Sequence, residues 1–148
     1  MRASEVDPHL FVIIGATGDL TARKLLPALY ELITEQGMGD RCRVLGLAGS
    51  QFDDQEFRTH ARRALAGAGY SEQGAKDWCD RAVHYQCIRS GYESLAERVE
   101  ALEKEYGLAG NRVFYLALPP SVFPTAIEGM GAAGLNRSAG WTRLVIEK

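Results

Sequence analysis

The sequence predicts an α/β fold, a doubly wound parallel sheet of about five strands with flanking helices. Three observations lead to this prediction. Strand-like and helix-like segments alternate along the chain, the strand-like runs are mostly apolar, and a glycine-containing turn joins the first run to the first helix. Strands that are apolar on both faces suit a parallel sheet covered by helices on both sides, with right-handed crossover connections.

The first half of this pattern begins with an unbroken apolar strand at residues 10–14. A helix is expected at 20–36, where apolar residues recur every three or four positions, and Pro27 predicts a kink or a late start. Gly37 and Gly39 should end this helix. A second strand is expected at 42–48. Asp53 and Glu56 then have the spacing of a capping box for a helix at 54–66.

The second half continues the alternation. A short helix is expected at 72–81 and a third strand at 83–88. The clearest amphipathic helix lies at 92–106, where Leu95, Val99, Leu102 and Tyr106 share one face, which we interpret as core. A fourth strand at 113–118 should stop at Pro119 and Pro120, followed by a helix at 121–130 and a fifth strand at 144–147.

Composition excludes several classes of protein. With 148 residues, 46% hydrophobic and 24% charged, the chain fits one folded domain and is neither disordered nor fibrous. A net charge of −2 argues against a nucleic-acid binder. Three scattered cysteines without a C-x-x-C pair fit a reducing compartment and no metal site. The sequence shows neither a signal peptide nor a membrane span, so a cytoplasmic protein is expected.

The turn after the first strand, Gly15-Ala16-Thr17-Gly18-Asp19-Leu20-Thr21, carries the chemical signal. Phosphate groups bind where backbone N–H groups at a helix N-terminus can be approached closely, and glycine permits that approach. The alternative is a turn that needs glycine only for its torsion angles. Thr17 and Thr21 stand where two common dinucleotide motifs have glycine, no tyrosine has a lysine four residues later, and no Walker A lysine is present.

Three stretches of the chain resemble the glucose-6-phosphate dehydrogenase family. GATGDLTARKLLPALYEL is similar to its coenzyme fingerprint, NRVFYLALPPSVF to its second signature, and WTRLVIEK to the strand before its Glu-Lys-Pro segment. They occur in the family's order and at similar spacing. The resemblance implies a Rossmann-type dinucleotide-binding domain over residues 1–148, with NADP as coenzyme and glucose 6-phosphate as substrate of the complete enzyme.

The resemblance also implies a set of site residues. Lys24 and Lys148 would lie at the substrate and nicotinamide end, as contacts and not as catalytic groups. Pro119, Pro120 and Leu118 would lie beside the nicotinamide ribose. The remaining coenzyme contacts would come from the first turn and from the end of the second strand: Gly15, Ala16, Thr17, Gly18, Asp19, Leu20, Gly49 and Ser50.

Two departures from the family pattern qualify these expectations. Gly49 stands where the family has an arginine that pairs with the 2′-phosphate of NADP, so we expect a weakened preference for NADP, with NAD left open as a second coenzyme. The family's substrate domain, with its catalytic histidine, is expected to be absent from this chain, and His9, His60 and His84 are poor candidates for a base. The complete enzyme would be a homo-oligomer. The alternatives are a non-catalytic nucleotide-binding module and an atypical reductase.

Overall fold

The computed structural model describes residues 6–19, 21–36, 39 and 41–146. Their strands form one five-stranded parallel sheet in the order β3-β2-β1-β4-β5. The strands are β1 His9–Ile14, β2 Cys42–Ala48, β3 Val83–Cys87, β4 Arg112–Leu116 and β5 Thr142–Ile146. The predicted doubly wound Rossmann-type fold is therefore confirmed.

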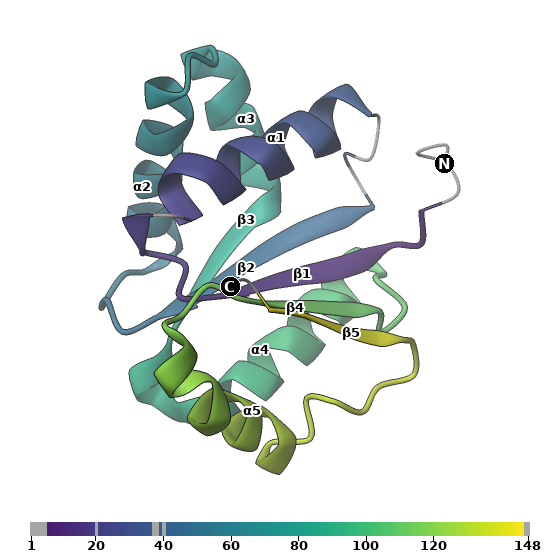
Figure 1. Ribbon diagram of the computed structural model, residues 1–148. Helices are drawn as coiled ribbons and strands as arrows, with labels where there is room; N and C mark the ends of the chain where they lie inside the picture. Colours follow the sequence, from purple (N-terminus) through teal and green to yellow (C-terminus); the bar gives the residue numbers. More distant parts are fainter. Residues whose placement is uncertain (1–5, 20, 37–38, 40, 147–148) are drawn as a thin grey trace.

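Helices cover both faces of the sheet. Figure 1 shows α1 (Leu26–Glu35), α2 (Asp54–Gly67) and α3 (Glu72–Ala82) on one side, with α4 (Gly91–Tyr106) and α5 (Phe123–Ala132) on the other. Short turns of other helix types precede three of them: η2 (Thr21–Leu25), η3 (Ile88–Ser90) and η4 (Pro120–Val122).

The strands are buried because successive side chains enter opposite cores. Ile13 and Val44 pack with the α1–α3 layer, whereas Val12 and Leu45 pack with the α4 and α5 layer. The edge strand β5 differs, since Leu144, Val145 and Ile146 are each 40% exposed or more.

The late start of the first helix that Pro27 predicted is confirmed. A π-helical turn precedes α1, and Pro27 lies in the first turn of α1, where the missing N–H of proline leaves no hydrogen bond unmade. Other predicted boundaries are wrong by a few residues. Strand β3 ends at Cys87 and β4 at Leu116, so Ile88 and Leu118 leave the sheet. Leu20, Gly37, Glu147 and Lys148 lie outside the described residues.

Strand order places the site. The chain builds β1, β2 and β3 in one direction and then returns to place β4 on the other side of β1. The connections after β1 and β4 therefore diverge to opposite faces, which opens a crevice at the carboxyl ends of these strands.

Candidate functional site

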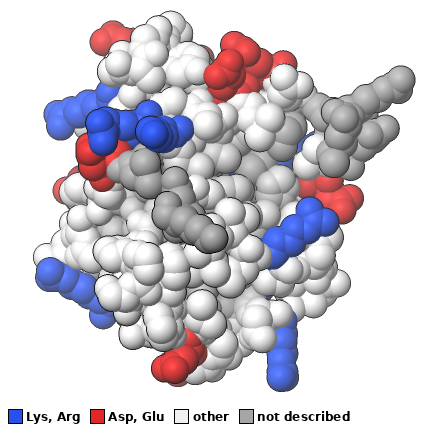
Figure 2. Space-filling model, in the orientation of Figure 1, with Lys and Arg blue, Asp and Glu red and all other residues white. Residues whose placement is uncertain are grey.

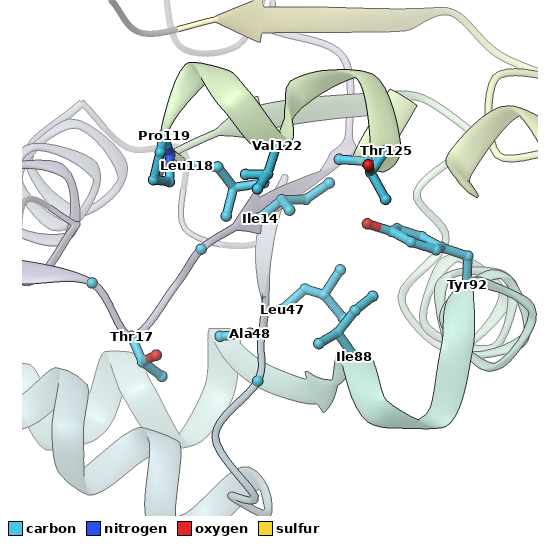
Figure 3. A pocket seen from close by; sticks show the side chains of 15 residues that line it. Ile14, Thr17, Leu47, Ala48, Ile88, Tyr92, Leu118, Pro119, Val122 and Thr125 are labelled. Atoms are coloured by element: carbon cyan, nitrogen blue, oxygen red, sulfur yellow. The ribbon is translucent and has the colours of Figure 1, made fainter. Parts of the chain in front are cut away.

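A cavity of about 500 Å³ opens at this switch point. Its walls come from the carboxyl ends of three adjacent strands and from the turns beyond them (Figure 3). β1 contributes Ile14, Gly15, Thr17 and Gly18; β2 contributes Leu47, Ala48 and Gly49; β4 and its turn contribute Ala117, Leu118 and Pro119. Segments separated by up to a hundred residues thus meet at one sheet edge because parallel strands end there together.

Gly15 is required by the fold itself. Its φ is +96°, a conformation that L side chains rarely adopt. A Cβ at this position would collide with the Ala117 carbonyl group, because the β1 turn crosses directly against the end of β4. The N–H groups of Gly15 and Ala16 both donate to the Leu47 carbonyl, at 2.8 and 3.1 Å, which anchors the turn to β2.

Gly18 is in a different situation. Its φ lies outside the left-handed region, and of the described residues only the Gly15 carbonyl oxygen would come within 4 Å of an added Cβ, at 3.3 Å. Packing in the described chain therefore opposes a side chain here much less than at Gly15. The lack of a side chain leaves the backbone of the turn open towards the cavity, as close approach of a phosphate requires.

Two threonines hold the turn in place. The buried Thr21 donates its hydroxyl to the Gly15 carbonyl at 3.2 Å. The Ser50 hydroxyl donates to the Thr17 hydroxyl at 3.2 Å, which joins the turn to the loop after β2. Thr21 stands where one dinucleotide motif has glycine, and in this structure its hydroxyl stabilises the turn.

Tyr85 on β3 holds the loop after β2 in place through hydrogen bonds. The Tyr85 hydroxyl donates to the carbonyl groups of Ala48 and Ser50, at 3.0 and 2.7 Å. Burial raises the pKa of this phenol to about 12, so it stays protonated and remains a donor. Gly49 between these anchors is exposed, and no described residue lies within 4 Å of the position of an added Cβ.

The other predicted site residues have varied positions. Ala16 is fully buried, so its side chain belongs to the core beneath the turn. Asp19 pairs with Arg23 at 2.8 Å on the surface, and Lys24 and Pro120 are exposed. Of the predicted site residues that the structure describes, five do not line the cavity itself: Ala16, Asp19, Lys24, Ser50 and Pro120. Leu20 and Lys148 were also predicted and lie outside the described residues.

The far wall of the cavity was missed by the sequence interpretation. It consists of Ile88 and Tyr92 beyond β3 and of Val122, Thr125 and Ala126 beyond β4. Figure 3 shows the Tyr92 hydroxyl pointing towards Thr125 across this part of the cavity. Burial raises the pKa of Tyr92. Its ring lies against Gly129, where any Cβ would clash. These residues lie within a few residues of the strand ends, at the start of the next helix. That position is the sequence signal that could have identified them.

The histidines lie away from this edge. His9 is the first residue of β1, at the amino end of the strand and away from the cavity, and its ring packs beside Trp141. His60 lies within α2 between aromatic rings, and His84 is the second residue of β3, buried against Tyr106. None of the three lines the cavity. The expectation that they are packing residues and poor bases is consistent with these positions.

The surface gives further limits. The face seen in Figure 2 is mostly uncharged, with acidic and basic side chains scattered around its rim and no continuous basic field. In the part of the chain that the structure describes, no three His, Cys, Asp or Glu residues gather as metal ligands. No helix there has the length and apolar character needed to cross a membrane. All three cysteines are free thiols.

Comparisons with known proteins show which family the chain resembles. A family model described as the glucose-6-phosphate dehydrogenase NAD-binding domain matches residues 12–148. The glucose-6-phosphate 1-dehydrogenase of Chlamydia pneumoniae is 41% identical over 152 residues, covering 95% of this chain and 30% of that protein. The enzyme of the same name from Aggregatibacter actinomycetemcomitans is 38% identical, covering 93% and 29%.

A structural relative supports the same grouping. A solved glucose-6-phosphate dehydrogenase in complex with its substrate glucose 6-phosphate superposes with a TM-score of 0.79 at 27% identity. The match covers 96% of this chain and 30% of that chain. The chain thus spans about 30% of the length of the relatives it matches.

Proposed function

The chain belongs to the glucose-6-phosphate dehydrogenase family, and we propose that it is the coenzyme-binding part of a glucose-6-phosphate 1-dehydrogenase. The complete enzyme would transfer hydride from C1 of glucose 6-phosphate to NADP and release 6-phosphogluconolactone, as the first step of the oxidative pentose phosphate pathway. The bound coenzyme supplies the hydride acceptor; this chain's residues hold and orient it.

One observation carries the proposal. The cavity of about 500 Å³ lies at the switch point of a doubly wound sheet, and Gly15, Gly18 and Gly49 line it. This is where such folds bind dinucleotides. Gly18 and Gly49 carry no side chains, and the position of a Cβ at Gly49 is open, so a pyrophosphate can reach the backbone of the first turn and a ribose can reach the loop after β2.

The lining fits the uncharged parts of the same ligand. Leu47, Ile88 and Val122 offer an apolar surface suited to a purine ring. The hydroxyl groups of Tyr92 and Thr125 add hydrogen-bonding capacity at the far wall (Figure 3). Leu118 and Pro119, beyond β4, would then contact the nicotinamide half, as the family resemblance implies.

Substrate contacts in this chain would be electrostatic. Lys24 is exposed in η2, one turn beyond the glycine turn, and would attract a sugar phosphate together with Lys148. A base for the C1 hydroxyl must lie within about 2.6–3.2 Å of it, directly or through one water. The three histidines are too far from the cavity edge for this role, so we propose that the base comes from outside these 148 residues.

We further propose a cytoplasmic location and a homo-oligomeric complete enzyme, with NADP as the physiological coenzyme. Free cysteines at all three positions fit a reducing compartment. The oligomer is inferred from the family resemblance alone.

Two matched surface variants test coenzyme binding at the cavity. Val122 and Val145 are both 40% exposed, but only Val122 lines the cavity. Val122→Glu should weaken NADP⁺ binding at least tenfold in titration calorimetry, because it puts a carboxylate into a site for an anionic ligand, while Val145→Glu should leave it unchanged. Equal affinities in both variants, or no binding by the parent chain, would refute the proposed site.

A further inference from the structure

The end of β3 lies directly beside the loop that should meet the coenzyme's 2′ position. Ala48 and Cys87 are paired in the parallel register of β2 and β3, so both strands end level with each other. The Cys87 thiol lies 3.8 Å from the Gly49 carbonyl oxygen. Adjacent strands are about 4.8 Å apart. The residues that follow Cys87 are therefore close neighbours of Gly49 and Ser50.

Arg89 is the cation at this end of β3. It occupies the middle of the η3 turn Ile88–Ser90, next to Ile88, which lines the cavity together with Gly49. Successive side chains of such a turn point roughly 120° apart. While Ile88 faces the cavity, the Arg89 side chain therefore leaves the turn in another direction, and it is exposed.

Three other arginines of the chain are already engaged. Arg23 pairs with Asp19, Arg98 pairs with Asp54 at 2.7 Å, and Arg58 donates to the Val83 carbonyl at 2.7 Å. By contrast, Arg89 has no hydrogen bond or ion pair with any residue that the structure describes. Its long side chain can thus turn towards the loop after β2 without breaking an existing contact.

We infer that Arg89 binds the 2′-phosphate of the coenzyme and replaces, from the neighbouring strand, the arginine that is missing at Gly49. The inference rests on the proposed function. A guanidinium forms paired, charge-assisted hydrogen bonds with phosphate oxygens, whereas the free 2′-hydroxyl of NAD offers it no charge. The open surface at Gly49 leaves room for the side chain to reach across the loop. The chain then prefers NADP over NAD in spite of Gly49.

The test compares ligands that differ only by the 2′-phosphate. The 148-residue chain is titrated calorimetrically with 2′,5′-ADP and 5′-AMP, and with NADP⁺ and NAD⁺. Arg89→Ala should weaken binding of 2′,5′-ADP and NADP⁺ roughly 10- to 100-fold, as expected for loss of a charged hydrogen-bond pair, and leave 5′-AMP and NAD⁺ within about twofold. Gly49→Arg added to Arg89→Ala should restore most of the loss.

The control is Arg81→Ala. Arg81 is also exposed, but it lies in the last turn of α3 just before β3, at the opposite edge of the sheet. Arg81→Ala should leave the affinities for all four nucleotides unchanged. Binding of every ligand by Arg89→Ala at parental strength, or an equal loss for both members of each pair, would overturn the role of Arg89 alone. Failure of the parent chain to bind any of the four ligands would instead overturn the proposed function and this inference together.

Discussion

The two glycines of the first turn should respond to substitution in opposite ways. Gly15 has a positive φ and no space for a Cβ, whereas Gly18 has an ordinary φ and a single tight contact at 3.3 Å with a described residue. Replacing Gly15 should therefore damage the fold, and replacing Gly18 should damage ligand binding. We consider Gly15→Ala and Gly18→Val, each measured for unfolding and for NADP⁺ affinity.

The magnitude for Gly15→Ala follows from two contributions. A left-handed conformation costs an alanine about 1–2 kcal/mol. Forcing a methyl group against the Ala117 carbonyl costs a further 1–3 kcal/mol or so, as for overpacked cores. The free energy of unfolding should therefore fall by about 2–5 kcal/mol, a large part of the roughly 5–15 kcal/mol typical of a domain.

Gly18→Val should change the free energy of unfolding by no more than about 1 kcal/mol. Among the described residues, its Cβ meets the Gly15 carbonyl oxygen alone, at 3.3 Å, and reduced freedom of the unfolded chain partly offsets that contact. Hydrogen bonds from the turn to a charged pyrophosphate are worth about 1.5–3 kcal/mol each. Losing one of them should weaken NADP⁺ binding at least tenfold.

Urea unfolding followed by circular dichroism measures the first quantity, and titration calorimetry measures the second. Gly67→Val is the control, because Gly67 ends α2 away from the cavity and no described residue lies within 4 Å of an added Cβ there. The reasoning would be refuted if Gly18→Val bound NADP⁺ as the parent chain does. It would also be refuted if Gly15→Ala unfolded at the parental urea concentration.

Three further predictions concern specificity, turnover and pH. Gly49→Arg should tighten NADP⁺ more than NAD⁺, since the added side chain meets no described residue; equal changes in the two calorimetric affinities would show that Gly49 does not face the 2′ position. The 148-residue chain should not reduce NADP⁺ with glucose 6-phosphate, and steady growth of NADPH absorbance would reveal a base among its own residues. Burial opposes ionisation of Asp54, but the neighbouring His84 ring and the hydrogen bonds from the Tyr85 backbone N–H and Arg98 outweigh burial and hold the pKa of Asp54 well below the usual range. The resulting stabilisation is present above the unfolded-state pKa of about 3.9 and is lost as the pH falls towards the folded-state pKa. Urea titrations between pH 6 and 3 should therefore show a steeper loss of stability for the parent than for Asp54→Asn, and identical slopes would contradict this role of Asp54.

The local pattern of the sequence determined the elements and their order. Apolar runs long enough for buried strands predicted all five strands, and the Asp53–Glu56 spacing predicted a capping box that the structure contains. The glycine turn after the first strand predicted where the site begins. These features depend on backbone geometry and hydrophobic period, which act over a few residues and can therefore be read locally.

Tertiary structure decided which residues share the cavity and why each glycine is there. Gly15 and Gly18 look alike in the sequence, yet only Gly15 meets the end of β4. Tyr92 and Thr125 come together because β3 and β4 end at the same sheet edge on either side of β1 and β2. The contact between the Cys87 thiol and the Gly49 carbonyl oxygen, from segments far apart in the sequence, follows from the β2–β3 register. Such contacts depend on strand order and register, which no short stretch of sequence encodes.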